Sequence, residues 1–253
     1  MKEKNVLKRR SAFVTGGSSG IGSAISHELS KRGITVYIGY NESYKSAMKL
    51  KNDIIYSGGN AEIIQVDVSD YNSVIKLRDS FHKEKEFIDI LVNNAGKVLR
   101  PGGWLEQDYK QVEETVHTNL LSVIYTMKAF VPDMINNNYG RIINISSTFA
   151  KSGAAQVLSY TASKAGVDNI TKSMARELGK FGITVNSVSP TVVDTKMARD
   201  AGNEFIKWAI DNSPLKVLAE PLDIAKAVVF MISQAKVTGQ DLIVDAGLSL
   251  NVC

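Results

Sequence analysis

The chain has 253 residues, of which 44% are hydrophobic, which is enough for one large α/β domain or two small ones. Its 30 basic and 26 acidic residues give a net charge of +4, an excess too small and too dispersed to indicate nucleic-acid binding. The basic first ten residues are not followed by a signal-like apolar run, no stretch reaches the length of a membrane span, and the single cysteine, Cys253, cannot form an internal disulfide. We therefore expect a cytoplasmic protein.

The first predicted elements are a strand, a tight turn and a helix. An apolar run at 12–14 leads into the turn TGGSSGIG at 15–22, apolar residues four apart follow over 21–29, and a second apolar run occupies 34–38. A Gly/Ser-rich stretch can also be a flexible spacer, but these flanks argue against one. Glycines let the backbone approach a phosphate, and the helix N-terminus attracts its charge. The turn is therefore predicted to bind a nucleotide, although its glycine spacing is not the commoner G-x-G-x-x-G.

Short apolar runs alternate with helical patterns along the rest of the chain. The further strand candidates are 61–68, 87–96, 140–147, 182–190 and 240–247. This alternation predicts the α/β class: one domain over 1–253, built as a Rossmann-type doubly wound parallel sheet of about seven strands with helices on both faces. Residues 191–220 show poor periodicity and are expected to form a substrate lid beyond the strand ends.

Four polar residues are candidates for catalysis. Tyr160 and Lys164 are four apart on a predicted helix, where an ammonium group would lower the pKa of a phenol. Ser147 ends a predicted strand at the edge where such a sheet places its site, and Ser146 is the competing serine. Asn119 lies among apolar neighbours, so it is either bonded structurally or used in a site.

These motifs resemble those of the short-chain dehydrogenase/reductase family over essentially the whole chain. The turn TGGSSGIG is similar to the family's cofactor turn, NNAG at 93–96 to its sheet-stabilising motif, and the four polar residues to its catalytic set. The resemblance implies that Tyr160 is the general acid for carbonyl reduction, or the base in reverse. It further implies that Lys164 lowers the pKa of Tyr160 and bonds the nicotinamide ribose, Ser147 binds the carbonyl oxygen, and Asn119 supports a water chain.

The same resemblance implies the cofactor contacts. They are Gly16, Ser18, Ser19, Gly20, Ile21, Tyr40, Asn41, Ser43, Asp67, Val68, Asn93, Ala95, Gly96, Tyr160, Lys164, Pro190, Val193 and Thr195. The family usually has Pro-Gly after its sixth strand, whereas this chain has Pro190-Thr191. Because a β-branched residue tolerates positive φ poorly, we expect this loop to follow a different path.

The residues after the second strand favour NADP(H) over NAD(H). Tyr40 stands where NAD-dependent relatives usually carry Asp, whose carboxylate would accept bonds from the ribose and repel a 2′-phosphate. Asn41 and Ser43, with Ser18 or Ser19, offer neutral groups to a 2′-phosphate, although Glu42 counts against it and the strong basic markers at 19 and 41 are missing.

The chain most resembles the 3-oxoacyl-acyl-carrier-protein and acetoacetyl-CoA reductase branches. This implies reduction of a 3-oxoacyl thioester and an acidic acyl carrier protein as partner, with Lys128, Lys172 and Arg176 as docking candidates. Neutral residues at 136–138 weaken that docking argument. A specialised ketoreductase, a sugar or polyol dehydrogenase, and an inactive nucleotide-sensing protein remain alternatives.

Other features bear on assembly and on the site. The predicted helices 109–134 and 159–178 carry apolar residues on more than one face, and with the family's pairing of these helices they predict a homotetramer, with 247–253 at a second interface. Trp104 and Trp208 are expected to pack, or to face substrate. No metal site is expected, since the three histidines have no partners at ligand spacing.

Overall fold

The fold comes from a computed structural model that describes residue 7, residues 10–98 and residues 104–250. Seven parallel strands form one sheet in the order β3-β2-β1-β4-β5-β6-β7. They are β1 (Ser11–Val14), β2 (Thr35–Tyr40), β3 (Asn60–Gln65), β4 (Ile90–Asn93), β5 (Gly140–Ile145), β6 (Ile183–Pro190) and β7 (Asp241–Val244). The predicted doubly wound sheet is confirmed. In the described part of the chain, no helix has both the length and the apolar composition to cross a bilayer.

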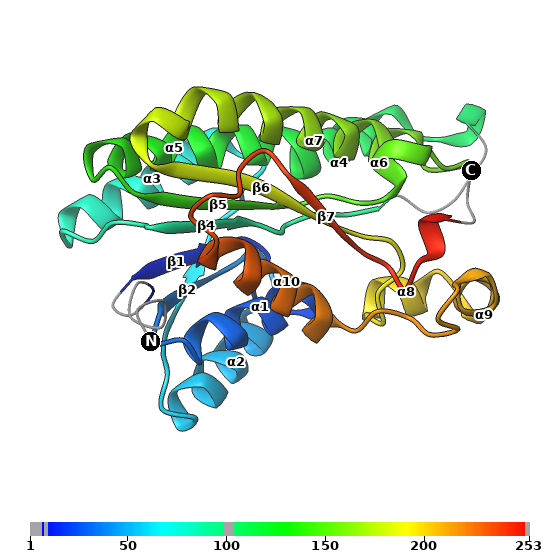
Figure 1. The fold of residues 1–253 in the computed structure, drawn as a ribbon, viewed down its shortest axis with the longest axis horizontal. Helices are drawn as coiled ribbons and strands as arrows, with labels where there is room; N and C mark the ends of the chain where they lie inside the picture. The colour runs from blue at the N-terminus through cyan, green and yellow to red at the C-terminus, as the bar shows by residue number, and fades with distance from the viewer. Residues whose placement is uncertain (1–6, 8–9, 99–103, 251–253) are drawn as a thin grey trace.

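Helices cover both faces of the sheet, as Figure 1 shows. One face carries α1 (Gly20–Ser30), α2 (Tyr44–Tyr56) and α10 (Pro221–Ser233), whose apolar residues form one core cluster with β1 and β2. The other carries α3 (Tyr71–Lys83), α4 (Tyr109–Val116), α5 (Ser122–Asn136), α6 (Phe149–Ser152) and α7 (Leu158–Leu178). Phe13, Leu91 and Phe130 are fully buried or nearly so in that second cluster.

The strand order reverses between β1 and β4, so the chain leaves their carboxyl ends toward opposite faces. Residues after β6 form α8 (Lys196–Asp200) and α9 (Asn203–Asn212) rather than an irregular loop. Ala198 of α8 and Ala209 of α9 pack with Leu248 of the C-terminal segment in a small separate cluster. That this region is a substrate lid stays a prediction.

Candidate active site

The turn after β1 is built for close approach of its backbone to other groups. Gly16 has φ +58°, and a Cβ there would lie 3.1 Å from the Cα of Ala95. A Cβ on Gly22 would overlap the Gly16 carbonyl oxygen, so both positions need glycine. Helix α1 begins at Gly20, and the side chain of its N-cap residue Ser19 makes no capping hydrogen bond. These features fit a phosphate group at the helix N-terminus.

Two side chains join this turn to the end of β4. The Thr15 hydroxyl oxygen accepts hydrogen bonds from the backbone N–H groups of Asn94 and Ala95, each at 2.9 Å. In return, Asn94 Nδ2 donates to the carbonyl oxygens of Thr15 and Gly16, each at 3.0 Å. Sequence reasoning missed the role of Thr15. Its only signal was a polar residue directly before the glycines.

Asn93, expected to line the cofactor, uses its side chain elsewhere. Its Nδ2 donates to Asn144 Oδ1 at 2.9 Å, and its Oδ1 accepts from the Thr126 hydroxyl at 2.7 Å. Asn144 in turn donates to Thr171 at 2.9 Å, so the amide belongs to a buried network between α5, α7 and the sheet. The side chain of Asn93 therefore holds the sheet to its helices, and a contact between Asn93 and the cofactor stays a prediction for its backbone.

Gly96 lies between two members of the predicted catalytic set. A Cβ on Gly96 would be 3.4 Å from Asn119 Oδ1 and 3.6 Å from Lys164 Nζ. Asn119 is fully buried on a π-helical turn, His117–Leu121, a distortion often found at functional sites. Its amide accepts from the backbone N–H of Lys97 and donates to the Lys97 carbonyl, both at 2.8 Å. Asn119 Nδ2 also donates to the Ser163 hydroxyl of α7 at 3.3 Å, so Asn119 fixes the loop after β4 against α7.

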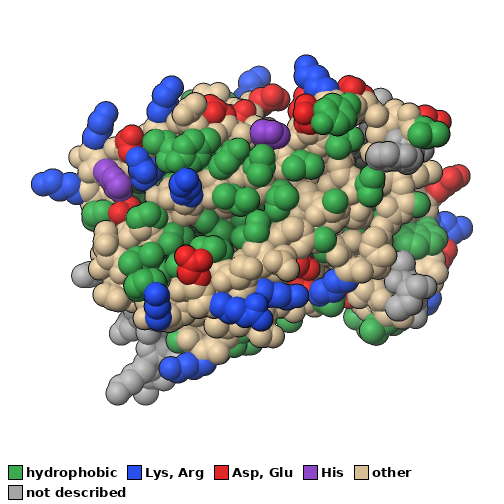
Figure 2. Space-filling model, turned by 90° about the horizontal axis from the view of Figure 1, so that it is seen from above, with side chains coloured by type: hydrophobic (Ala, Val, Ile, Leu, Met, Phe, Trp, Pro, Cys, Tyr) green, Lys and Arg blue, Asp and Glu red, His purple; other side chains and the backbone are tan. Residues whose placement is uncertain are grey.

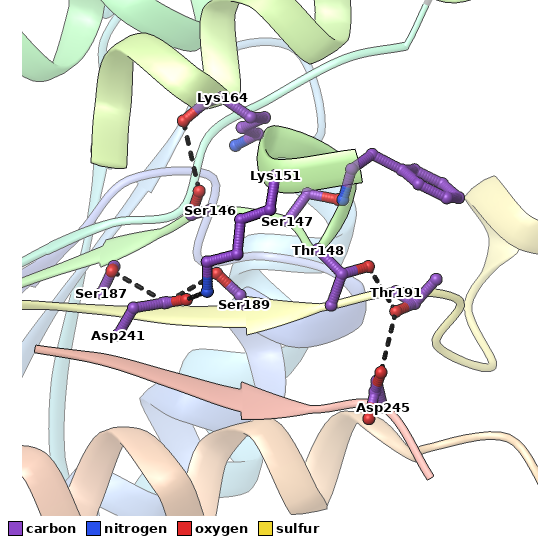
Figure 3. A network of polar contacts seen from close by, with 11 residues as sticks. Ser146, Ser147, Thr148, Lys151, Lys164, Ser187, Ser189, Thr191, Asp241 and Asp245 are labelled. Atoms are coloured by element: carbon purple, nitrogen blue, oxygen red, sulfur yellow. Dashed lines mark hydrogen bonds and ion pairs between the residues drawn. The ribbon is translucent and has the colours of Figure 1, made fainter. Parts of the chain in front are cut away.

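Tyr160, Ser147 and Lys164 meet beside this loop. Ser147 acts on Tyr160 by lowering its pKa, whereas the Ser146 hydroxyl donates to the Lys164 carbonyl oxygen at 3.3 Å (Figure 3). Lys164 Nζ is 5.9 Å from the Tyr160 ring centroid and donates to the Ile145 carbonyl at 2.7 Å. The catalytic role of Ser147, the serine chosen from the sequence, stays a prediction.

The pKa of Tyr160 does not follow the expectation. Burial raises the pKa of Tyr160, and the neighbouring Ser147 side chain opposes the rise. Burial also lowers the pKa of Lys164 to about 8, against the opposing charge of Asp168. The predicted net lowering of the tyrosine pKa is wrong for this structure, because burial of Tyr160 dominates and the Lys164 ammonium donates to a backbone carbonyl.

The residues expected around an adenosine group lie at the ends of β2 and β3. Tyr40 is buried, with its ring 6.1 Å from that of Tyr44, while Asn41 and Ser43 are exposed. Asp67 Oδ1 accepts hydrogen bonds from the N–H and hydroxyl of Ser69, at 2.9 and 2.6 Å. Of the remaining candidates here, Val68 and Ser18 are buried and Ile21 is half-buried.

The loop after β6 accommodates Thr191 without a positive φ. The Thr191 hydroxyl is hydrogen-bonded to that of Thr148 at 2.5 Å and donates to Asp245 at 3.5 Å (Figure 3). Thr195 lies against the cofactor turn, since a Cβ on Gly20 would be 3.4 Å from Thr195 Cγ2. The neighbouring candidates differ in their contacts: the Pro190 carbonyl accepts from the Thr148 N–H at 3.0 Å, and buried Val193 bridges to Ala219.

Of the two tryptophans, Trp208 packs against a neighbouring ring. Trp208 of α9 is 39% exposed and stacks on Phe205 with ring centroids 5.8 Å apart. The side chain of Trp104 lies outside the described residues.

Comparisons with known proteins agree with this geometry. A family model described as enoyl-(acyl carrier protein) reductase matches residues 16–249. The 3-oxoacyl-acyl-carrier-protein reductase FabG of Vibrio harveyi is 36% identical over 244 residues, which cover 96% of this chain and 98% of the relative. A 3-oxoacyl-acyl-carrier-protein reductase from Brucella melitensis with bound NAD superposes with a TM-score of 0.86 at 28% identity, covering 96% and 92% of the two chains. A gluconate 5-dehydrogenase from Burkholderia cenocepacia in complex with NADP and tartrate gives 0.90 at 28% identity, covering 96% of each chain.

Proposed function

The chain belongs to the short-chain dehydrogenase/reductase family of oxidoreductases, and on that premise we propose that it reduces the ketone of a 3-oxoacyl thioester, using NADPH. The observation that carries the proposal is that Tyr160, Lys164 and Ser147 meet at one point: Lys164 Nζ lies 5.9 Å from the Tyr160 ring centroid, and Ser147 lowers the pKa of Tyr160. The similarity to 3-oxoacyl reductases over nearly the full chain supports the substrate class.

The roles proposed for the side chains follow from their chemistry. The Ser147 hydroxyl donates a hydrogen bond to the substrate carbonyl oxygen and holds it beside Tyr160. As negative charge develops on that oxygen, the Tyr160 hydroxyl donates its proton, and the Lys164 ammonium stabilises the phenolate that results. Asn119 holds the loop that borders Lys164 and supports the water chain that returns the proton.

A dinucleotide fits the residues around the turn after β1. The positive φ at Gly16, the uncapped Ser19 hydroxyl and the nearby Thr195 suit a pyrophosphate at the N-terminus of α1. When bound, the nicotinamide supplies the hydride for the reduction.

We propose NADP(H) because no carboxylate ends β2. Buried Tyr40 stands there, and the exposed neutral side chains of Asn41 and Ser43 follow it. The two structural relatives contain NAD and NADP, one each, so the preference of this chain is a proposal from its own residues.

A sugar or polyol dehydrogenase is the second candidate, favoured by the similarity to the gluconate 5-dehydrogenase. A substrate panel that follows NADPH absorbance separates the two. Acetoacetyl thioesters on CoA and on acyl carrier protein are compared with keto sugar acids. Turnover of the thioesters alone supports the proposal, turnover of the sugar acids alone favours the second candidate, and no turnover with intact NADPH binding indicates a nucleotide-sensing protein.

An acidic carrier protein is the proposed macromolecular partner. Lys128 on α5 and Lys172 and Arg176 on α7 are exposed, as a docking surface requires. Their replacement by glutamine should raise KM for the carrier-bound substrate and leave KM for the CoA thioester unchanged.

We also propose a homotetramer. Figure 2 shows hydrophobic side chains gathered over the face formed by α4, α5 and α7. Ile124 is 40% exposed there, and Ala162 and Ala165 are exposed, although Val167 is buried within the subunit. A second copy that pairs the same helices would cover this surface. Light scattering should give about four times 27.6 kDa, and a constant mass of 27.6 kDa would contradict the proposal. Residues 251–253 of the suggested second interface lie outside the described part.

A further inference from the structure

A short helix follows Ser147 directly and contacts its hydroxyl group. Helix α6 (Phe149–Ser152) begins two residues after Ser147. The N–H group of Phe149 donates to Ser147 Oγ at 3.2 Å, and the N–H group of Ala150 donates to the Ser147 carbonyl oxygen at 3.0 Å. Because Ser147 Oγ accepts the first of these bonds with a lone pair, its own proton stays available for donation to a substrate. A shift of α6 would therefore move the hydroxyl of Ser147.

Helix α6 is too short to hold its own position. An isolated helix of one turn is not stable in water. None of the four residues of α6 is buried, so apolar packing holds the helix only weakly. It lies beside α7, and Lys151 Nζ forms an ion pair with Asp241 Oδ2 at the start of β7 (Figure 3). This ion pair connects the segment after Ser147 to the last strand of the sheet.

Asp241 is a fixed partner for Lys151. Its other oxygen, Oδ1, accepts hydrogen bonds from the hydroxyl groups of Ser187 and Ser189 on β6, at 2.9 and 2.6 Å. The side chain of Asp241 is 11% exposed, and that of Lys151 is 47% exposed. A fully exposed ion pair contributes little, because two mobile side chains have to be ordered in water. Here the sheet already holds the carboxylate, so only the lysine has to be ordered.

We propose that Lys151 and Asp241 are positioning residues, whose ion pair fixes α6 and thereby the direction of the Ser147 hydroxyl. The residue between Ser147 and α6 is held separately, since the Thr148 N–H donates to the Pro190 carbonyl oxygen at 3.0 Å. The chain is thus attached to β6 directly after Ser147 and to β7 through Lys151. The effect on turnover rests on the proposed function, whereas the attachment of α6 does not.

The first test needs no cofactor or substrate. Amide hydrogen exchange of residues 147–153 is compared in wild type and in Lys151→Met, which keeps an unbranched side chain but removes the charge. Exchange of this segment should be about fivefold faster in the variant, and Lys151→Arg, which keeps the charge, should restore it. The matched control is Lys31→Met on α1, since Lys31 is 53% exposed and is paired with Glu28, which is 12% exposed. Lys31→Met should leave the exchange of residues 147–153 unchanged.

The second test separates positioning of Ser147 from a general loss of structure. Lys151→Met and Asp241→Asn should each lower kcat about tenfold with NADPH affinity retained, and Lys151→Arg should restore kcat. In a Ser147→Ala background, Lys151→Met should lower kcat no further, because the hydroxyl that the ion pair positions is already missing.

Two results would overturn the proposal. One is a Lys151→Met variant whose exchange or kcat equals that of wild type, and the other is an equal fold-loss of kcat with and without the Ser147 hydroxyl. If Asp241→Asn does not fold, Lys151→Met decides alone, because Lys151 is exposed and its replacement leaves the two serine bonds to Asp241 in place. Faster exchange in Lys151→Met with no turnover of any substrate by wild type would support the attachment of α6 and count against the proposed function.

Discussion

The hydroxyl groups of Thr148 and Thr191 are hydrogen-bonded at 2.5 Å, which joins the residue after Ser147 to the residue after β6. Thr191 extends the link to Asp245, whose carboxylate accepts N–H groups of Gly247 and Ser249 at 2.8 Å each. These bonds order the segment whose Leu248 packs against α8 and α9.

Thr191→Val should therefore loosen the region 191–220. It keeps the β-branched shape but removes the hydroxyl, so we expect a loss of about 1 kcal/mol of unfolding free energy and a several-fold rise in substrate KM with a smaller change in kcat. Denaturant unfolding and steady-state kinetics measure both. The control is Thr184→Val in β6, since the buried Thr184 hydroxyl has no partner among the described residues and its loss should not destabilise. Equal effects of the two substitutions would contradict the link.

Ala246→Gly should stabilise the protein. Ala246 has φ +55°, a conformation that costs a residue with a Cβ about 1 kcal/mol and that glycine adopts freely. After the greater entropy of glycine in the unfolded chain is subtracted, a gain of about 0.5 kcal/mol remains. Ala201→Gly, at an ordinary φ of −76°, should instead destabilise by a similar amount. Thermal unfolding of both variants provides the comparison, and a loss at both positions would refute the argument.

Cofactor preference can be tested at the end of β2. Tyr40→Asp should weaken NADPH relative to NADH through charge repulsion, but it also buries a carboxylate where an aromatic ring packs. Asn41→Asp is the cleaner variant, because Asn41 is exposed. In Asn41→Asp, the kcat/KM with NADPH divided by the kcat/KM with NADH should be about tenfold lower than in wild type. This is equivalent to ~1.4 kcal/mol of differential binding. A wild-type enzyme that already prefers NADH would defeat the NADP assignment.

The lowered pKa of Lys164 predicts a specific pH dependence of stability. The unfolded lysine titrates near 10.5 and the folded one near 8, so between these values the unfolded chain binds more protons and stability rises with pH. Below pH 8 the buried charge of Lys164 lowers the free energy of unfolding by ~3 kcal/mol. Lys164→Met should remove both this loss of stability and the rise of stability with pH. The exposed Lys172→Met on the same helix should leave them intact. Denaturant titrations at pH 7, 8 and 9 are sufficient to measure this rise. Burial raises the pKa of Tyr160 above 10, so the titration of Tyr160 makes stability fall with pH only above this range. A free energy of unfolding of the wild type that does not change between pH 7 and 9 would contradict the prediction.

The fold could be predicted because strand and helix patterns are local. Alternation of apolar runs with helical spacing is enough to place seven strands, and the glycines mark the turn after the first of them. The role of Thr15 could not be predicted, since its partners Asn94 and Ala95 lie about 80 positions away and only the β1–β4 pairing brings them together.

The pKa values of the site could not be predicted from the sequence either. The four-residue spacing places Lys164 beside Tyr160, but the pKa of a phenol depends on burial and on where the ammonium group donates. The network that engages the Asn93 side chain could not be predicted for a similar reason, because a motif gives the position of an amide and not the direction of its side chain.

The most direct test of the account is the rate at which the purified enzyme oxidises NADPH with an acetoacetyl thioester, compared with that of Tyr160→Phe. We expect turnover by wild type and a loss of about 10²- to 10⁴-fold in kcat for Tyr160→Phe, with NADPH affinity retained, because the variant lacks the transferable proton. Ser147→Ala should lower kcat strongly and Ser146→Ala weakly, since Ser147 acts on the pKa of Tyr160, whereas the Ser146 hydroxyl donates to the Lys164 backbone carbonyl. A near-normal kcat for Tyr160→Phe, or the reverse ranking of the two serines, would contradict the proposed site.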